Sequence, residues 1–326
     1  MSNCAAASRD GAEPVAGTSA TARTWLLVEQ AGPWGTNALT ESHLEPRIGR
    51  ALEAAAGGTG VRVALIRRPG RHADGRGANG RRVFVAHTAP GRAWIRTTTL
   101  ANTEPLLGLD FVRLGGGEHD GLWGPYVGEP LVFVCTNGKR DRCCAVLGRP
   151  LAAELAASGV EAWEVTHIGG HRFSPTLFVL PYGYAYGRAS APLVKDAVES
   201  AREGRILLDH CRGRSTWERP AQAADLAVRE LIREDRADAL DVVHTEAAPF
   251  PSVAPSPAGA PASAGPPPRV RATSTPVWTV VVAHRDGRSW QVTVEQRADG
   301  TPAPASCGSP LGKPSRMAVP SIRRLA

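Results

Sequence analysis

The sequence lacks any long apolar run. No stretch approaches the ~18 consecutive apolar residues of a membrane span, so we expect no membrane-spanning segment. Residues 1–23 are small and polar, and they lack the apolar core of a signal peptide. We therefore expect a soluble, cytoplasmic protein with a mobile N-terminal tail over residues 1–23, in which Cys4 has no assigned role.

Clustered positive charge and a disulfide framework are also missing. Lys and Arg exceed Asp and Glu by 38 to 31, but the arginines are scattered, which argues against nucleic-acid binding. The excess positive charge suits docking to an acidic redox partner such as a flavoprotein. Six cysteines in 326 residues are too few for a disulfide framework, and their clustering indicates metal chemistry in a reducing compartment.

The stretch from residue 131 to residue 187 carries the chemistry. Leu131 to Val134 is a short apolar run that predicts a buried strand, with Cys135 at its end. Leucines recur every four residues after Cys144, which predicts a helix that begins near Cys143 and Cys144. Free backbone N–H groups and the helix dipole stabilise thiolates at such a position.

A second predicted strand, Val160 to Val165, leads into a His-x-Gly-Gly-His box formed by His167 and His171. Strand ends and a helix start then converge on one point, as they do in open α/β folds. Two glycines let the backbone bend tightly, so that both rings can face one metal. The sequence therefore predicts a metal or cluster site made of two thiolates and two imidazoles.

Three kinds of chemistry fit these residues. Two Cys and two His can bind zinc or a [2Fe–2S] cluster, and the eight residues between Cys135 and Cys144 suit a centre larger than one ion. A structural zinc site stays open. So does thiol–disulfide exchange on a thioredoxin-like scaffold, although Cys143 and Cys144 are adjacent and no Cys-x-x-Cys motif is present.

At these residues the chain resembles the sucrase/ferredoxin-like proteins, whose cluster domain is a thioredoxin-like ferredoxin. The matching residues are Cys135-Thr136-Asn137-Gly138, Asp141, Cys143-Cys144, Gly148-Arg149-Pro150, His167 to Phe173, Pro181-Tyr182-Gly183 and Tyr186-Gly187-Arg188. Weaker matches lie at Trp25 to Gly35 and at Cys307-Gly308. One departure is Asn137, where many relatives have His.

The resemblance implies a [2Fe–2S] cluster ligated by Cys135, Cys144, His167 and His171, with Cys143 as the alternative thiolate that spacing alone does not separate from Cys144. It also implies an electron carrier or redox component rather than a stand-alone enzyme. Sucrose hydrolysis has no support, because no paired carboxylates stand in a glycosidase setting. Two neutral imidazoles in place of thiolates raise a cluster's potential, and their outer nitrogens can couple electron transfer to a proton.

Two parts of the chain repeat the order strand, helix, strand, hairpin, helix. These parts are residues 24–110 and 129–206. The repeated order predicts an α/β protein with two thioredoxin-like halves, and only the second half holds cluster ligands.

The predicted organisation is accordingly a first half over 24–128, a ferredoxin domain over 129–246, a Pro/Ala-rich linker over 247–275, and a C-terminal β-hairpin and tail over 276–326. Cys211 and Cys307 receive no function.

Overall fold

Two runs of the chain fold with the same order of elements. The computed structural model describes residues 4–70, 80–248 and 275–326. The first run contains β1 (Thr24–Glu29), α2 (Ala38–Glu41), α3 (Pro46–Ala56), β2 (Val61–Arg67), β3 (Arg81–His87), β4 (Trp94–Leu100), η1 (Glu104–Gly108), α4 (Phe111–Gly116) and β5 (Gly124–Pro125). The second run contains β6 (Leu131–Cys135), α5 (Arg142–Ala157), β7 (Ala162–Val165), η2 (His171–Phe173), β8 (Leu177–Leu180), β9 (Tyr184–Tyr186), α6 (Ala191–Arg202) and β10 (Cys211–Arg214).

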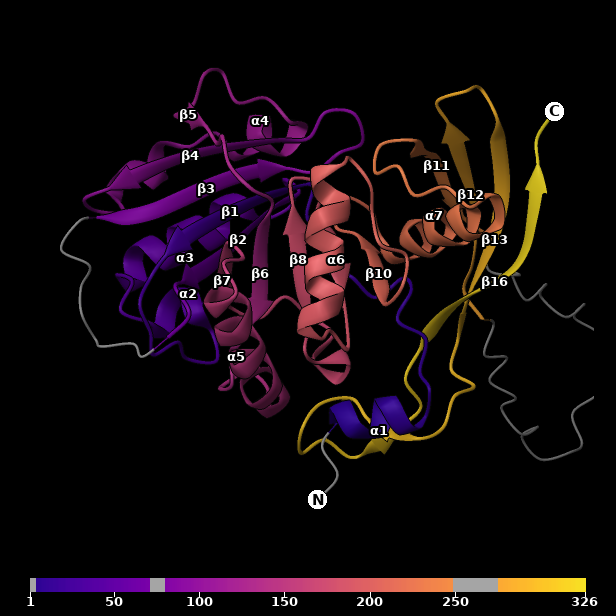
Figure 1. Ribbon diagram of the computed structural model, residues 1–326, viewed down its shortest axis with the longest axis horizontal. Helices are drawn as coiled ribbons and strands as arrows, with labels where there is room; N and C mark the ends of the chain where they lie inside the picture. The colour runs from indigo at the N-terminus through magenta and orange to yellow at the C-terminus, as the bar shows by residue number, and fades with distance from the viewer. Residues whose placement is uncertain (1–3, 71–79, 249–274) are drawn as a thin grey trace, which may run out of the picture.

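All strands of both runs belong to one ten-stranded mixed sheet, in the order β10-β9-β8-β6-β7-β2-β1-β3-β4-β5 (Figure 1). In each run the first two strands are parallel, and the third strand pairs antiparallel with the first. The runs join where β2 and β7 pair antiparallel. The prediction of an α/β protein is confirmed, and the shared strand order agrees with the predicted internal repeat. The thioredoxin-like character of each half stays a prediction.

The sheet has a helix-covered face in each half. In the first half, Leu26 and Val28 of β1 pack with Ile48 and Leu52 of α3. In the second half, apolar residues of β6 and β8 pack under α5 and α6. Alternation of side chains along each strand sends the remaining strand residues to the opposite face.

That opposite face closes on itself around aromatic rings. Trp25 of β1 stacks on Phe178 of β8 with ring centroids 4.4 Å apart, although four strand pairings separate β1 from β8 in the sheet. Phe84 of β3 meets Phe133 of β6 and Trp163 of β7 edge to face. The sheet therefore curls strongly, and the two halves share one buried core.

A smaller antiparallel sheet stands beside the main one. It comprises β11 (Leu240–Ala247), β12 (Val277–His284), β13 (Ser289–Arg297) and β16 (Arg316–Arg324), in that spatial order. Helix α7 (Arg219–Ile232) packs against it through Ala224 and Val228 (Figure 1). The predicted hairpin is β12 and β13, but the predicted tail is wrong, because β14 (Ala303–Pro304), β15 (Leu311–Gly312) and β16 lie within it. The predicted linker lies outside the described residues from 249 to 274.

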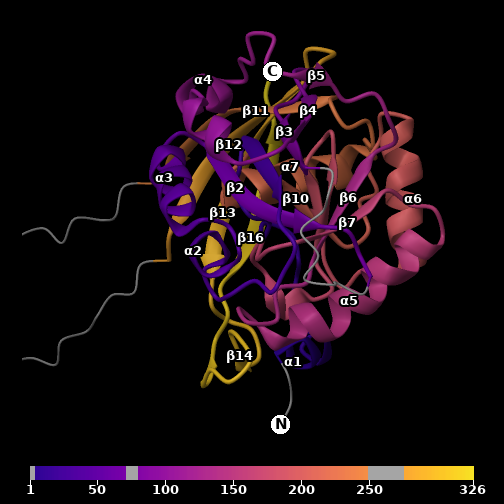
Figure 2. The same ribbon diagram turned by 90° about the vertical axis from the view of Figure 1, so that its left-hand side faces the viewer.

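The N-terminal segment that is predicted as a mobile tail contains a helix among its described residues. Residues 4–10 form helix α1 (Cys4–Asp10), which contacts η2 and β14. Figure 1 and Figure 2 both place α1 beneath the main sheet, near the start of the chain. Arg188 donates to the backbone oxygens of Ser8 and Glu13 at 2.9 and 2.7 Å, so the segment is fastened to the second half.

Candidate metal centre

The predicted site residues lie at the ends of neighbouring elements. Cys135 is the last residue of β6, and Cys144 lies in the first turn of α5. Asp141 caps that helix by accepting the Cys143 N–H at 2.9 Å. His167 follows the end of β7, and His171 opens η2. The strand order places β6 beside β7, and this brings the ends together.

Three of the four predicted ligands converge on one point. One sulfur each from Cys135 and Cys144 and a ring nitrogen of His167 all lie within 4.8 Å of one another. The rings of His167 and His171 have centroids 5.3 Å apart. Both thiols are 0% exposed. The two thiols and His167 thus form one compact group with His171 against His167; the thiols are buried, and both imidazoles are partly exposed.

Both imidazoles leave a nitrogen available to a metal. Nδ1 of His167 and Nδ1 of His171 are buried and have no hydrogen-bond partner. Buried polar atoms without a partner are rare in proteins. Nε2 of His171 lies 2.6 Å from the Ala305 backbone oxygen and 3.8 Å from the Asp141 carboxylate. Metal-binding histidines are held in this way by an oxygen on the far nitrogen, so the residues fit a metal or a [2Fe–2S] cluster.

The two thiols differ in their protonation. The Cys144 S–H donates to Cys135 and, together with His167, lowers the pKa of Cys135 well below its ordinary value despite complete burial. The same contact with Cys135, followed by burial, raises the pKa of Cys144. Ser174 also donates to the Cys144 sulfur at 3.7 Å. The pair therefore holds one thiolate readily, and thiolates are the form that binds metals.

Two arginines from other elements place positive charge against the site. Arg62 of β2 donates to the His167 backbone oxygen at 3.0 Å, so the first half contributes a side chain to the second half's site. Arg212 of β10 is fully buried and donates to the Gly169 backbone oxygen at 3.3 Å. Burial lowers the pKa of Arg212 to about 10, while Arg172 acts in the same direction and the two thiols act against it. Neither role is indicated by a sequence motif.

Glycine is required at the second Gly of the histidine box. Gly170 has φ +71°, and a Cβ there would lie 2.0 Å from the Arg212 guanidinium. Gly148 of α5 meets a similar limit, because its Cβ would lie 2.3 Å from the Cys135 backbone oxygen. Both glycines let neighbouring groups approach the site closely.

Cys143, the alternative thiolate, lies in a different group. Its sulfur is 3.5 Å from that of Cys4 and 3.0 Å from that of Cys307, with Asp141 beside them. Cys4, which the sequence places in a tail, is 0% exposed. Cys211 is buried in the core under α6.

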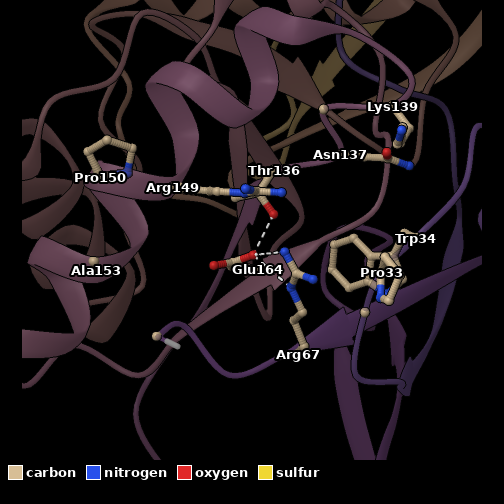
Figure 3. A pocket seen from close by; sticks show the side chains of 13 residues that line it. Pro33, Trp34, Arg67, Thr136, Asn137, Lys139, Arg149, Pro150, Ala153 and Glu164 are labelled. Carbon is tan, nitrogen blue, oxygen red and sulfur yellow. Dashed lines mark hydrogen bonds and ion pairs between the residues drawn. The ribbon is translucent and has the colours of Figure 1, made fainter. Parts of the chain in front are cut away.

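A pocket of about 680 Å³ adjoins the loop between Cys135 and Cys144 (Figure 3). On its floor Arg67 bonds Glu164 at 2.7 Å, and Thr136 donates to the same carboxylate at 2.7 Å. Lys139 and Arg149 stand at its edge (Figure 3). The corresponding loop of the first half supplies Trp34, which is 5% exposed and stacks under Arg67 at 4.2 Å. Trp34 is therefore mainly a packing residue.

The family model described as sucrase/ferredoxin-like matches residues 15–213. A curated relative is "Altered inheritance of mitochondria protein 32" of Meyerozyma guilliermondii, 30% identical over 97 residues. That match covers 26% of this chain and 34% of the relative, so the chain spans about a third of the relative's length. No solved structure matches the chain.

Helix length gives one more observation. Among residues 4–70, 80–248 and 275–326, no helix is long and apolar enough to cross a membrane.

Proposed function

The chain belongs to the sucrase/ferredoxin-like family, and on that basis we propose that it is an electron-transfer protein. In this proposal Cys135, Cys144, His167 and His171 hold a [2Fe–2S] cluster. The observation that carries it is the convergence of His167 on two buried thiols, with buried, partnerless Nδ1 atoms on both His167 and the adjoining His171. A cluster with two imidazole ligands supplies one-electron chemistry at a higher potential than one with four thiolates.

The protein's own residues set the conditions for that chemistry. Complete burial of both thiols keeps water away from the site. Arg62 and Arg212 offset negative charge there, which favours the reduced state. His171 holds the proton of its Nε2 against the Ala305 oxygen, which fixes the ring with Nδ1 inward.

The partner is proposed from surface charge. Lys139, Arg140, Arg142 and Arg149 are exposed around the loop and first turns that carry the two thiols. A basic face of this kind attracts an acidic redox partner, and a flavoprotein reductase is the partner class we propose. Replacing Lys139 and Arg149 by Glu reverses their charge and should slow reduction by such a partner at low ionic strength. The difference in reduction rate between this variant and the wild type should decrease in high salt.

The first test is the visible spectrum of anaerobically purified protein, with iron, sulfide and zinc assayed on the same sample. The proposal expects a red-brown protein with about two irons and two sulfides per chain. Cys135→Ser and His167→Ala should remove the colour, whereas the buried Cys211→Ser should keep it. A colourless wild-type protein that still lacks iron after reconstitution would overturn the proposal.

A second test addresses the imidazole ligands. His171→Cys should lower the reduction potential and retain a visible spectrum, because a thiolate replaces a neutral ligand. If electron transfer is coupled to a proton at Nε2, the wild-type potential falls with rising pH between about 6 and 10, and the variant loses part of that slope. An unchanged potential in the variant would contradict ligation by His171.

We also propose that the protein works in a reducing compartment, the cytoplasm. This proposal rests on the six cysteines, none of which is in a disulfide although the sulfurs of three of them are in contact.

A further inference from the structure

A second group of sulfurs lies beside the candidate cluster site. Cys4, Cys143 and Cys307 bring their Sγ atoms to 3.5, 3.6 and 3.0 Å from one another. The Asp141 carboxylate oxygens both lie 3.8 Å from the Cys4 sulfur. One ligand atom from each of the four residues falls within 4.8 Å of every other.

The four side chains come from three distant parts of the sequence. Cys4 belongs to α1, Asp141 and Cys143 to the start of α5, and Cys307 to the loop between β14 and β15. Figure 1 shows α1 lying directly beside the C-terminal loop. Convergence of three thiols across separations of 139, 164 and 303 residues is not produced by any local helix or strand geometry.

The arrangement is preorganised and largely buried, with Cys307 partly exposed. Cys4 and Cys143 are 0% and 2% exposed, and Asp141 is 4% exposed. Asp141 accepts the backbone N–H of Cys143 and that of Cys307, each at 2.9 Å, one on each carboxylate oxygen. These bonds fix the carboxylate and leave each oxygen a second lone pair.

The spacing fits one tetrahedral ion. With Zn–S bonds of about 2.3 Å, sulfurs at the corners of a tetrahedron lie about 3.8 Å apart. The two distances from Cys4, 3.5 and 3.6 Å, are close to this value, whereas the Cys143–Cys307 distance of 3.0 Å would have to lengthen on binding. Each iron of a [2Fe–2S] cluster takes two protein ligands, whereas three thiols converge on one point here. The group therefore suits a single ion better than such a cluster. Thiolates together with one carboxylate suit zinc better than calcium or magnesium.

We propose that Cys4, Cys143, Cys307 and Asp141 bind one zinc ion in a closed, structural site. The ion fastens α1 and the C-terminal loop to the start of α5. Since that loop also contributes the Ala305 oxygen to His171, the ion holds in place a group that orients a candidate cluster ligand. Metal binding at such a site contributes directly to folding free energy.

A disulfide between Cys143 and Cys307 is the rival reading of their 3.0 Å contact. A disulfide would not explain why Cys4 and the Asp141 carboxylate also lie in this group.

The test uses the full-length protein, with zinc and iron measured on the same preparations. We expect about one zinc per chain in the wild type and in the Cys211→Ser control. Cys4→Ser and Cys307→Ser should each lose most of the zinc, and Cys307→Ser should keep its iron. Iron missing from every sample would count against the proposed function and leave the zinc result standing.

Zinc-edge X-ray absorption on the wild type gives a readout that needs no variant to fold. Three sulfurs and one oxygen around zinc support the proposal. Two sulfurs and two nitrogens would overturn it, because they would place zinc at Cys135, Cys144 and the histidines. Absence of zinc together with an intact mass 2 Da lower, the signature of a disulfide, would also overturn it.

Discussion

His87 is a buried histidine outside both metal-binding candidates. It is 2% exposed on β3, and its Nδ1 lies 2.9 Å from the hydroxyl of Thr24. That hydroxyl donates to the Leu114 oxygen at 2.7 Å, so Nδ1 is the donor to Thr24 and the neutral ring is the stable form. Burial, then repulsion by Arg92, lowers the pKa of His87 from 6.5 to about 4.

The pH dependence of stability follows from that pKa. Between pH 6.5 and about 4 the unfolded chain binds a proton at His87 that the folded chain does not, so stability decreases as pH falls through this window. The loss attributable to His87 is at most about 3 kcal/mol. Urea unfolding across this window should show a shallower acid decline for His87→Asn than for the wild type. His43→Asn, at an exposed site, should retain the wild-type decline; equal slopes in all three proteins would refute the account.

Arg62 gives a prediction for the proposed redox site. Its guanidinium contacts the His167 backbone oxygen and lies 5.6 Å from the Trp25 ring centroid. Arg62→Gln removes a positive charge from a site that gains an electron, so the potential should fall, by on the order of 50 mV. Arg23→Gln, which breaks an exposed hydrogen bond to Thr59, should leave the potential unchanged. An unchanged potential for Arg62→Gln would show that its charge does not act on the site.

At the scale of elements, α7 is anchored by a buried ion pair. Asp225 and Arg229 are four residues apart on the helix, both 0% exposed, with Nε and Oδ1 3.0 Å apart. Arg229 also donates to the Tyr184 hydroxyl at 2.9 Å, which ties α7 to the main sheet. Burial is the main influence that raises the pKa of Asp225, although Arg229 opposes it.

Breaking this pair should be costly. Asp225→Asn leaves the Arg229 charge buried without its partner, and we expect a loss of about 3 to 5 kcal/mol in the free energy of unfolding. Glu199→Gln, which breaks an exposed pair with Arg202, should cost less than about 1 kcal/mol. Denaturant unfolding measures both. A similar, small effect of the two substitutions would mean that Asp225 does not anchor the helix.

The elements of the main sheet follow from the sequence more closely than those at the ends of the chain. Apolar runs predict the strands that flank the site, and leucine spacing predicts α5. Helix α1 gives no such signal, because its burial depends on Cys143 and Cys307 and not on a periodic apolar face. Strand β16 contains Pro320 and several arginines, and as an edge strand it is stabilised by pairing with β13.

Some residues of the candidate site can be predicted from the sequence and others cannot. Strand ends and a helix start predict that Cys135, Cys144 and His167 converge, and in the structure they do. Arg62 and Arg212 were missed because each comes from a strand remote in sequence, and only sheet order brings them near. Spacing could not separate Cys143 from Cys144, since adjacent residues of a helix point about 100° apart and the direction of each depends on packing.

For the whole molecule, the curled sheet makes the two halves interdependent. Phe178 of the second half stacks on Trp25 of the first and on Phe133 of its own half, at 4.4 and 5.0 Å. Neither half can bury this aromatic core alone. The main sheet should therefore unfold in one transition, despite its internal repeat.

Phe178→Ala tests this cooperativity. It should lower the free energy of unfolding by about 3 to 5 kcal/mol. In urea, the transitions followed by tryptophan fluorescence and by far-ultraviolet circular dichroism should shift together. The conservative Phe178→Leu should cost less and shift both probes equally. Two separated transitions, only one of them sensitive to Phe178, would show that the halves unfold independently.

The position of α1 also sets an order of events during synthesis. Cys4 leaves the ribosome early, yet its neighbour Cys307 is translated 303 residues later. At 5–20 residues per second that interval is roughly 15 to 60 s. In the later part of this interval, after His171 has been made and until Ala305 follows 134 residues later, the carbonyl of Ala305 does not yet exist and His171 lacks this contact. A newly made chain therefore passes through a stage in which the first half and the four candidate ligands have been made but the loop that contacts His171 has not.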